Sequence, residues 1–343
     1  MEADAAFQER GIVRVRYVLQ RVGFLFLSIW AAVTINFVLP RLMPGNPAGA
    51  MFAKFQGRMT PMALKALEAE FGFNNQPLII QYLHYIGGLF TWHLGLSFLY
   101  YPTPVTAVIA SSLPWTVGLV GAFTILSVFV GTSLGILIAW RRGGLLDSVL
   151  PTTFMFLQSS PAFWVAFMLL FIFGFTLSWF PMSHAYSNSL VLGFTPPVVV
   201  SIIYHAVLPG ATIFLSSLSG WMIGMRNNMI NTLGEDYIVF AEAKGISGGR
   251  LLFSYAARNA ILPQVTSFAI ALGGIVNGSI LVETVFSYPG IGYQLTSAVS
   301  SEDYPLIQGT FLIIALSVLI VNFIVDMLLV KLDPRVRTGG VSS

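Results

Sequence analysis

Residues 113–140 read LPWTVGLVGAFTILSVFVGTSLGILIAW, a stretch that contains no charged side chain. A helix needs roughly 20 apolar residues to cross the hydrocarbon core of a bilayer, so this stretch is long enough to span a membrane. The whole chain has the same character, since 56% of its 343 residues are hydrophobic and 9% are charged. A soluble domain carries about 25% charged residues. The sequence therefore predicts an integral membrane protein.

The small net charge and the lack of cysteine exclude several other classes of protein. The chain has 17 Lys and Arg residues against 14 Asp and Glu, a formal net charge of +3. Such a small excess argues against a nucleic-acid partner, and the lipid bilayer is the expected surroundings. Because no cysteine is present, disulfides, thiolate metal sites and cysteine nucleophiles are excluded.

Charged residues divide the chain into neutral segments that predict an all-α protein with six transmembrane helices. Helices are expected because lipid offers no hydrogen-bond partner to an unpaired backbone amide. Pro40 is expected to end the first span, residues 113–140 form the second, and turn-forming residues at 181–197 separate the third from the fourth. The enclosing residues are Arg21 and Arg41 for the first span, Asp147 and Arg226 for the third and fourth, Arg258 and Glu283 for the fifth, and Asp303 and Asp326 for the sixth.

The distribution of Lys and Arg predicts that both termini are cytoplasmic. With that orientation, the two later external loops contain no Lys or Arg. Loops rich in Lys and Arg stay in the cytoplasm, whereas a long external segment is little affected by its charge. The four exceptions, Arg41, Lys54, Arg58 and Lys65, all fall in the long first external segment. The expected parts are a cytoplasmic N-terminus at 1–21, span one at 22–40, an external helical insert at 41–112, a core of spans two to six at 113–330, and a cytoplasmic C-terminus at 331–343.

A cleaved secretory signal is the alternative interpretation of the first apolar segment. Ala48-Gly49-Ala50 resembles a cleavage site. The apolar run before it is longer than the usual run of about 7–15 residues, and Pro40-Arg41 intervenes. We therefore expect an uncleaved first span.

The external insert at 41–112 is predicted to contain two helices. One begins at Thr60-Pro61 and ends near Gly72, because a hydroxyl cap followed by proline starts helices and glycine ends them. The other runs from Pro77 through Phe90. Two interpretations remain open: a lip that meets an extracytoplasmic partner, or a pair of amphipathic helices lying on the membrane.

The cytoplasmic loop at 227–262 is unusually structured. Residues 232–245 predict a short helix with acids at its start, and Gly245 is expected to end it. A second helix is expected after Ser247. Either the loop docks to a cytosolic protein or its helices pack on each other. In both cases a surface must cover the apolar residues of the first helix, which are Tyr237, Ile238, Phe240 and Ala241.

This loop resembles that of binding-protein-dependent ABC importer permeases, especially the dipeptide, oligopeptide and nickel branch. The likeness lies in Ala241-Glu-Ala-Lys-Gly245 followed by RNAILP at 258–263, and it extends to LPRLMPGNP at 39–47, SPAFW at 160–164, VETVFSYPGIG at 282–292 and DPRVR at 333–337. The resemblance implies the type I importer fold. Val239 stands where the wider pattern has glutamate. The residues that the resemblance assigns to coupling with an ATPase are Asp236, Tyr237, Ile238, Ala241, Glu242, Ala243, Lys244, Gly245 and Ile246.

The resemblance also implies partners and a location. The partners are a second homologous permease subunit, two cytosolic ATPase subunits that hold ATP and Mg, and an extracytoplasmic solute-binding protein. The location is the plasma (inner) membrane of a bacterium or archaeon. Di- and oligopeptides are the expected cargo. Oligosaccharides remain an alternative because residues 57–59 and 98–105 look like relatives that import them, and nickel remains a third.

Motifs for catalysis and metal binding are missing from the sequence. The phosphate-binding loop of ATPases requires a Gly-Lys pair. The four lysines, Lys54, Lys65, Lys244 and Lys331, are preceded by Ala, Leu, Ala and Val. No H-E-x-x-H occurs, and the four histidines are scattered. We therefore expect no enzyme activity, no catalytic or metal-binding residue and no cofactor in this chain.

Two carboxylates and a glycine-rich face are the remaining candidates for function within the spans. Ionisable groups there mark functional sites by default, and a secondary transporter, the alternative class of function, would use Glu283 and Asp326 as ion sites. A structural or gating role is the favoured interpretation for both. Glycines allow close helix packing or line a path. The residues expected at the translocation path or gate are Gly273, Gly274, Asn277, Gly278 and Glu283.

Overall fold

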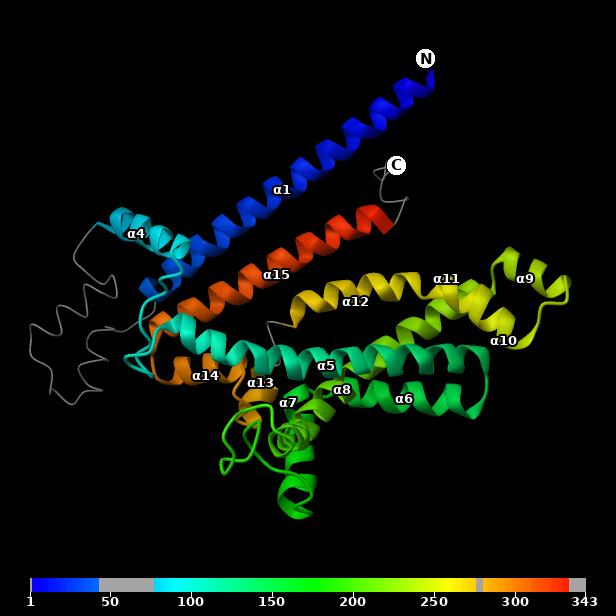
Figure 1. The fold of residues 1–343 in the computed structure, drawn as a ribbon. Coiled ribbons are helices and arrows are strands. Elements are labelled where there is room, and N and C mark those ends of the chain that lie inside the picture. The colour runs from blue at the N-terminus through cyan, green and yellow to red at the C-terminus, as the bar shows by residue number, and fades with distance from the viewer. Residues whose placement is uncertain (1, 43–76, 276–279, 333–343) are drawn as a thin grey trace, which may run out of the picture. The chain divides into compact units, whose positions relative to one another are not determined.

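The computed structural model describes residues 2–42, 77–275 and 280–332, and the regular structure of these residues is helical apart from one isolated bridge between Leu96 and Pro104 (Figure 1). Four helices in this part of the chain are long and apolar enough to cross a membrane, and a bent pair would make a fifth span. The helix expected at 60–72 lies outside the described residues. The chain divides into two compact units, residues 1–113 with 294–343 and residues 114–293.

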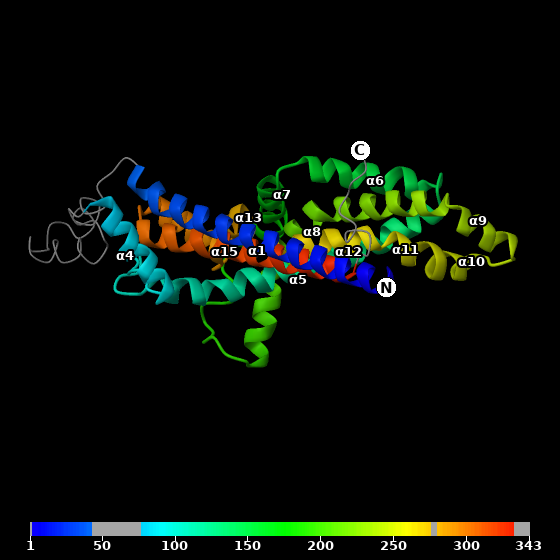
Figure 2. The same ribbon diagram turned by 90° about the horizontal axis from the view of Figure 1, so that it is seen from above.

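The first unit is built on two long helices from opposite ends of the sequence. Helices α1 (Glu2–Leu42) and α15 (Tyr304–Leu332) lie side by side, as both views show (Figures 1 and 2). The apolar span Val18–Val38 ends just before Pro40, where the sequence placed its end, but the helix itself continues through Pro40 to Leu42. Proline lacks the amide that would donate to the carbonyl four residues earlier. Here the Gln308 side-chain amide donates to that carbonyl, on Asn36, at 3.0 Å, and the Asn36 amide donates to the Gln308 carbonyl at 2.8 Å.

Helix α4 (Leu78–Phe90) begins after Pro77 and ends as predicted. The loop that follows is fixed to the start of α15 by Asp303, a wholly buried carboxylate. Ser97 Oγ and the Leu99 amide donate to its Oδ2 at 2.5 and 2.8 Å, and the Leu306 amide donates to its Oδ1 at 3.1 Å. Asp303 therefore caps α15 and anchors the loop at once.

The second unit is organised by close packing between α5 (Val105–Trp140) and α8 (Pro196–Leu233). A Cβ atom at Gly131 would lie 2.7 Å from Trp221 Cβ, and one at Gly135 would lie 2.5 Å from the Met222 carbonyl oxygen. Small residues four apart allow backbones to approach in this way. Helix α5 ends at Trp140 as predicted but begins at Val105 rather than near residue 113, because Pro114 costs the helix one hydrogen bond without ending it.

The expected third span is not one straight helix. Helix α6 (Leu145–Ser159) is followed by α7 (Ala162–Leu169) and the π-helix η1 (Leu170–Thr176), and the two parts meet at an angle of 99°. Pro161 causes the break, since a residue before proline is pushed out of the helical region, and Ser160 has a ψ of 136°. A prediction from apolar composition alone missed this bend.

Candidate functional site

The loop after α8 contains a short helix, α9 (Asp236–Ala243). It begins later than the predicted residue 232, because α8 itself runs on to Leu233. Its end agrees with the prediction. Gly245 has a φ of +82°, a conformation that glycine adopts without strain, and the amides of residues 245 and 246 donate to the carbonyls of Glu242 and Ala241 at 2.8 and 3.1 Å. Lys244 is the residue just past the last turn.

One side of α9 is anchored in an apolar cluster. Ile238 is 1% exposed and Ala241 is 5% exposed. They pack with buried residues of α8 and of the π-helix η2 (Leu251–Ala257), so a movement of α9 must carry these elements with it. The other buried members of the cluster are Ala139, Met225, Met229, Leu251, Leu252, Ala256, Ala257 and Ala260.

The opposite side of α9 faces outward. The expectation that Tyr237 and Phe240 are covered is not met within the described chain, where Phe240 is 68% exposed and Tyr237 is 40% exposed. Tyr237 Oη accepts a hydrogen bond from Asn259 Nδ2 at 2.9 Å, and Lys244 Nζ lies 5.3 Å from the centre of the Phe240 ring. Glu242, Ala243 and Gly245 are also exposed, whereas Ile246 is half-buried. The helix thus has one face fixed to the chain and one face available to a partner.

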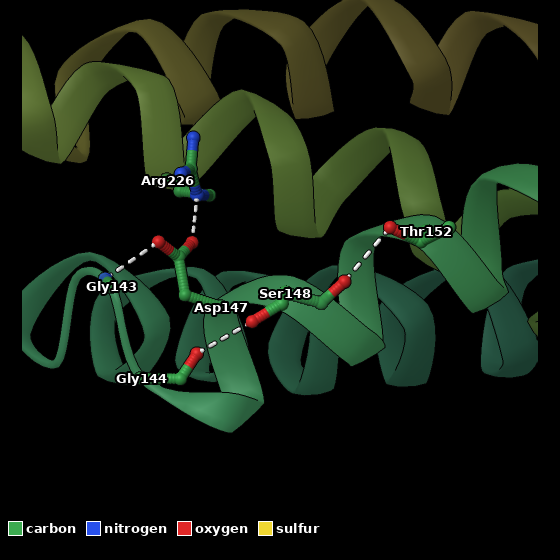
Figure 3. Close-up of polar contacts among 6 residues, drawn as sticks. All are labelled: Gly143, Gly144, Asp147, Ser148, Thr152 and Arg226. Atoms are coloured by element: carbon green, nitrogen blue, oxygen red, sulfur yellow. Dashed lines mark hydrogen bonds and ion pairs between the residues drawn. The ribbon is translucent and has the colours of Figure 1, made fainter.

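An ion pair connects the start of α6 to α8 near the cluster (Figure 3). Arg226 Nε donates to Asp147 Oδ1 at 2.6 Å, and the Gly143 amide donates to Asp147 Oδ2 at 3.0 Å. Ser148 Oγ donates to the Gly144 carbonyl at 3.0 Å in the same turn. The sequence identified the two charged residues only as boundaries of an uncharged stretch. Each is an isolated charge beside a span, which is the signal that predicts pairing.

Replacing Asp147 with Asn should destabilise the chain by about 1–3 kcal/mol. The side chains of Arg226 and Asp147 are 24% and 10% exposed, so the loss lies between the roughly 0.2–1 kcal/mol of an exposed pair and the roughly 3–5 kcal/mol of breaking a buried one. Thermal unfolding of the purified chain would measure it. A double-mutant cycle with Arg226→Gln would show no coupling energy if the pair contributed nothing.

The structure describes only some of the residues expected at the translocation path, and these differ in exposure. Gly273 is buried and Gly274 is exposed in α12 (Leu262–Gly274), while Asn277 and Gly278 lie outside the described residues. The sequence did not identify Gln264 of α12, which is 6% exposed. Its Nε2 donates to the Trp221 carbonyl of α8 at 3.3 Å, beside Gly224, where a Cβ would lie 2.6 Å from that nitrogen. Gly224 follows Gly220 by four residues on α8, and this spacing is the only trace of the contact in the sequence.

Glu283 is wholly buried in the short helix α13 (Ile280–Val285), and hydrogen-bond donors surround its carboxylate. Thr116 Oγ1 donates to Oε1 at 2.8 Å, and the Gly292 amide donates to Oε2 at 2.7 Å. Thr116 Oγ1 in turn accepts from the Ile291 amide at 2.7 Å. These amides open helix α14 (Ile291–Ser300), whose N-terminus favours a negative charge. Glu283 therefore caps α14, and sequence reasoning missed Thr116 as its partner.

Asp326, the other carboxylate predicted within the spans, forms an ion pair with Arg21. The Arg21 Nη1 to Asp326 Oδ2 distance is 2.8 Å, and it joins α15 to α1. The two side chains are 43% and 31% exposed, so the pair adds little stability. No group of three or more metal-binding side chains occurs in residues 2–42, 77–275 and 280–332.

Comparison with known proteins identifies the family. The model of the binding-protein-dependent transport system inner membrane components matches residues 131–338. The dipeptide transport system permease protein DppB of Lactococcus lactis is 33% identical over 325 residues, which cover 94% of this chain and 99% of the relative. The di/tripeptide permease DppB of Pseudomonas aeruginosa is 32% identical over 334 residues, with 94% and 98% covered. DppB of Escherichia coli K12 is 30% identical over 339 residues, with 94% and 99% covered.

These matches confirm the family resemblance deduced from the loop around α9. The family match spans more than half of the chain, and it includes α8, α9 and the buried Glu283. Together with the four apolar helices, it describes a multi-pass protein of the inner membrane that works in transport and not as an enzyme. The chain belongs to the family of inner membrane components of binding-protein-dependent transport systems.

Proposed function

We propose that the chain is a transmembrane subunit of an ATP-driven importer and forms half of a translocation path for di- and oligopeptides. The observation that carries this proposal is the similarity to three permeases named for dipeptides or tripeptides, along 94% of the chain. None of those names mentions oligosaccharides or nickel, so the alternatives drawn from residues 57–59 and 98–105 receive no support. The partners are a second homologous permease, two cytosolic ATPases that bind ATP and Mg, and an extracytoplasmic solute-binding protein.

The proposed topology has six spans with both termini in the cytoplasm. Four long apolar helices supply four of the spans. The bent pair at 145–176 and the helices α12 and α13 would supply the other two. The cations support the orientation, because the segment containing α9 holds Lys244, Arg250 and Arg258. Residues 41–112 then form the external insert, 113–330 the core, and 227–262 the cytoplasmic loop.

The exposed face of α9 would dock to an ATPase subunit. Phe240 and Tyr237 have the size and exposure of interface anchors, and aromatic anchors contribute most of the binding energy in protein interfaces. Ile238 and Ala241 on the other face fix α9 to α8 and η2. A displacement of α9 would thus be transmitted to the membrane helices through packed side chains. In this proposal the chain forms the translocation path and carries the coupling helix, while its partners hydrolyse ATP.

Uptake experiments test the proposed cargo directly. Cells that lack this gene should lose uptake of a radiolabelled dipeptide and regain it when the gene returns on a plasmid. Uptake of nickel and of an oligosaccharide should stay unchanged in the same strains. Normal dipeptide uptake in the deletion strain, with loss of either other solute, would contradict the proposal.

Replacing Phe240 with Asp should release the ATPase subunits from the permease. Loss of a central aromatic anchor costs about 2 kcal/mol or more, roughly 30-fold in affinity. The measurement is the amount of ATPase that co-purifies with the chain in mild detergent. Phe194→Asp is the matched control, since Phe194 is fully exposed in the segment before α8 and should retain the ATPases. Equal retention by both variants, at the wild-type level, would show that α9 is not the docking element.

A further inference from the structure

Helix α4 contacts α1 through the polar side chains of Gln81, Tyr82 and Tyr85. Each of them forms a hydrogen bond to α1, whereas His84 is exposed. The ring of Phe37 on α1 packs against two tyrosines of α4. Its centre lies 5.1 Å from the ring centre of Tyr82 and 5.6 Å from that of Tyr85. The hydrogen-bonded pairs are Arg41 Nη2 to Gln81 Oε1 at 3.0 Å, Thr34 Oγ1 with Tyr82 Oη at 2.7 Å, and Asn36 Nδ2 to Tyr85 Oη at 3.1 Å.

The opposite side of α4 is apolar, and none of the described residues covers it. Ile79, Leu83 and Phe90 on this side are 63%, 61% and 84% exposed. Residues 78–90 include no Lys, Arg, Asp or Glu, and His84 is the only one that can carry a positive charge. The distribution of polar and apolar side chains on α4 is the reverse of that on a surface helix of a soluble protein. Such a helix has its apolar side against the protein core and its charged side in water.

The position and length of α4 identify what covers this face. Its partners Thr34, Asn36 and Arg41 lie at the end of the span Val18–Val38 of α1, so α4 sits at the boundary of the membrane. With 13 residues it is about 20 Å long, too short to cross a hydrocarbon core of about 30 Å. On α1 the apolar residue Ile35, next to Thr34 and Asn36, is likewise 63% exposed.

We propose that α4 is embedded in lipid, with its apolar face among the acyl chains of the leaflet at the C-terminal end of α1. An uncharged face suits acyl chains, whereas a soluble protein partner would be recognised in part by charge. The exposed Trp92, two residues past the end of α4, suits the headgroup layer. This inference needs the membrane location of the chain and not the proposed cargo.

Site-directed spin labelling tests the proposal, and the chain needs no prior removal of cysteines because it has none. The labelled variants are Leu83→Cys and Ile79→Cys on the apolar face of α4. Phe26→Cys, at an exposed position within the span of α1, is the lipid reference, and Glu302→Cys, at an exposed charged position, is the water reference. Leu89→Cys, on the half-buried side of α4, is the matched control. The full chain is reconstituted in vesicles of phosphatidylethanolamine and phosphatidylglycerol, and collisions with oxygen and with a water-soluble nickel chelate are measured.

Labels at positions 83 and 79 should collide with oxygen as frequently as the label at position 26 and should lose access to the nickel chelate. The label at position 89 should be reached poorly by both reagents. Nickel access equal to that at position 302 would mean that the face lies in water, and it would overturn the proposal. Poor access of both reagents to positions 83 and 79 would mean that protein covers the face, which would overturn it equally.

Discussion

Replacing Gly135 with Leu should prevent the chain from reaching its folded state. A Cβ at this position would lie 2.5 Å from the Met222 carbonyl oxygen and 2.7 Å from Met225 Cβ, so the backbones of α5 and α8 would have to separate. Overpacking a core costs about 1–3 kcal/mol when side chains can adjust, and backbone contacts leave no such freedom. We expect destabilisation above about 3 kcal/mol, measured as loss of monodisperse protein and a lowered unfolding midpoint in detergent.

Gly118→Leu on the same helix is the matched control for this experiment. Gly118 is exposed, and nothing lies within 4 Å of a Cβ built there. Leucine is also the better helix former by nearly 1 kcal/mol. The control should therefore fold as well as the parent chain. Equal yields and unfolding midpoints for the two leucine variants would contradict the close packing of α5 on α8.

Replacing Glu283 with Ala should destabilise the second unit strongly. The change leaves the Thr116 hydroxyl and the Gly292 amide without their acceptor, and each unsatisfied buried group costs about 1–3 kcal/mol. The expected total is roughly 2–6 kcal/mol. Glu283→Gln keeps one acceptor oxygen and should cost less. Unfolding of the purified variants would measure both changes.

The same variants separate a structural role for Glu283 from a transport role. If the carboxylate mainly caps α14, transport should fall in proportion to the amount of folded protein. Glu242→Ala, which removes an exposed carboxylate, should leave the unfolding midpoint unchanged. If Glu283→Gln unfolded like the parent chain and yet abolished peptide uptake, the carboxylate would instead act in an ion-coupled step, as in a secondary transporter.

Local sequence signals predicted several boundaries of elements, although α5 and α9 begin elsewhere than expected. The bounds of α4, the end of α5 at Trp140 and the turn at Gly245 follow from prolines, charges and a glycine within a few residues of each end. The 99° bend after Ser159 was missed because apolar composition is the same whether a segment runs straight or turns. Pro161 carried the signal, but prolines at 114 and 209 lie inside continuous helices, so a proline alone does not predict a break.

The candidate site was predictable only in part, for a related physical reason. The short helix with its terminal glycine has a local pattern, and so it was identified. Which of its faces would be buried depends on α8 and η2, and the sequence of α9 alone does not contain them. Glu283 was identified as a candidate, but its donor Thr116 was not, because Thr116 lies 167 positions earlier in the chain. Both members of such a pair look like isolated polar residues in apolar surroundings.

The exchange of hydrogen bonds between Asn36 and Gln308 has a consequence for how the chain is made. The two residues are separated by 272 positions. A ribosome adds about 5–20 residues per second, so Asn36 is synthesised roughly 15–50 s before the side chain that completes its helix. Until α15 arrives, the Asn36 carbonyl of α1 lacks the donor that Gln308 supplies in the folded chain. A product truncated before α15 would keep this backbone group without that donor.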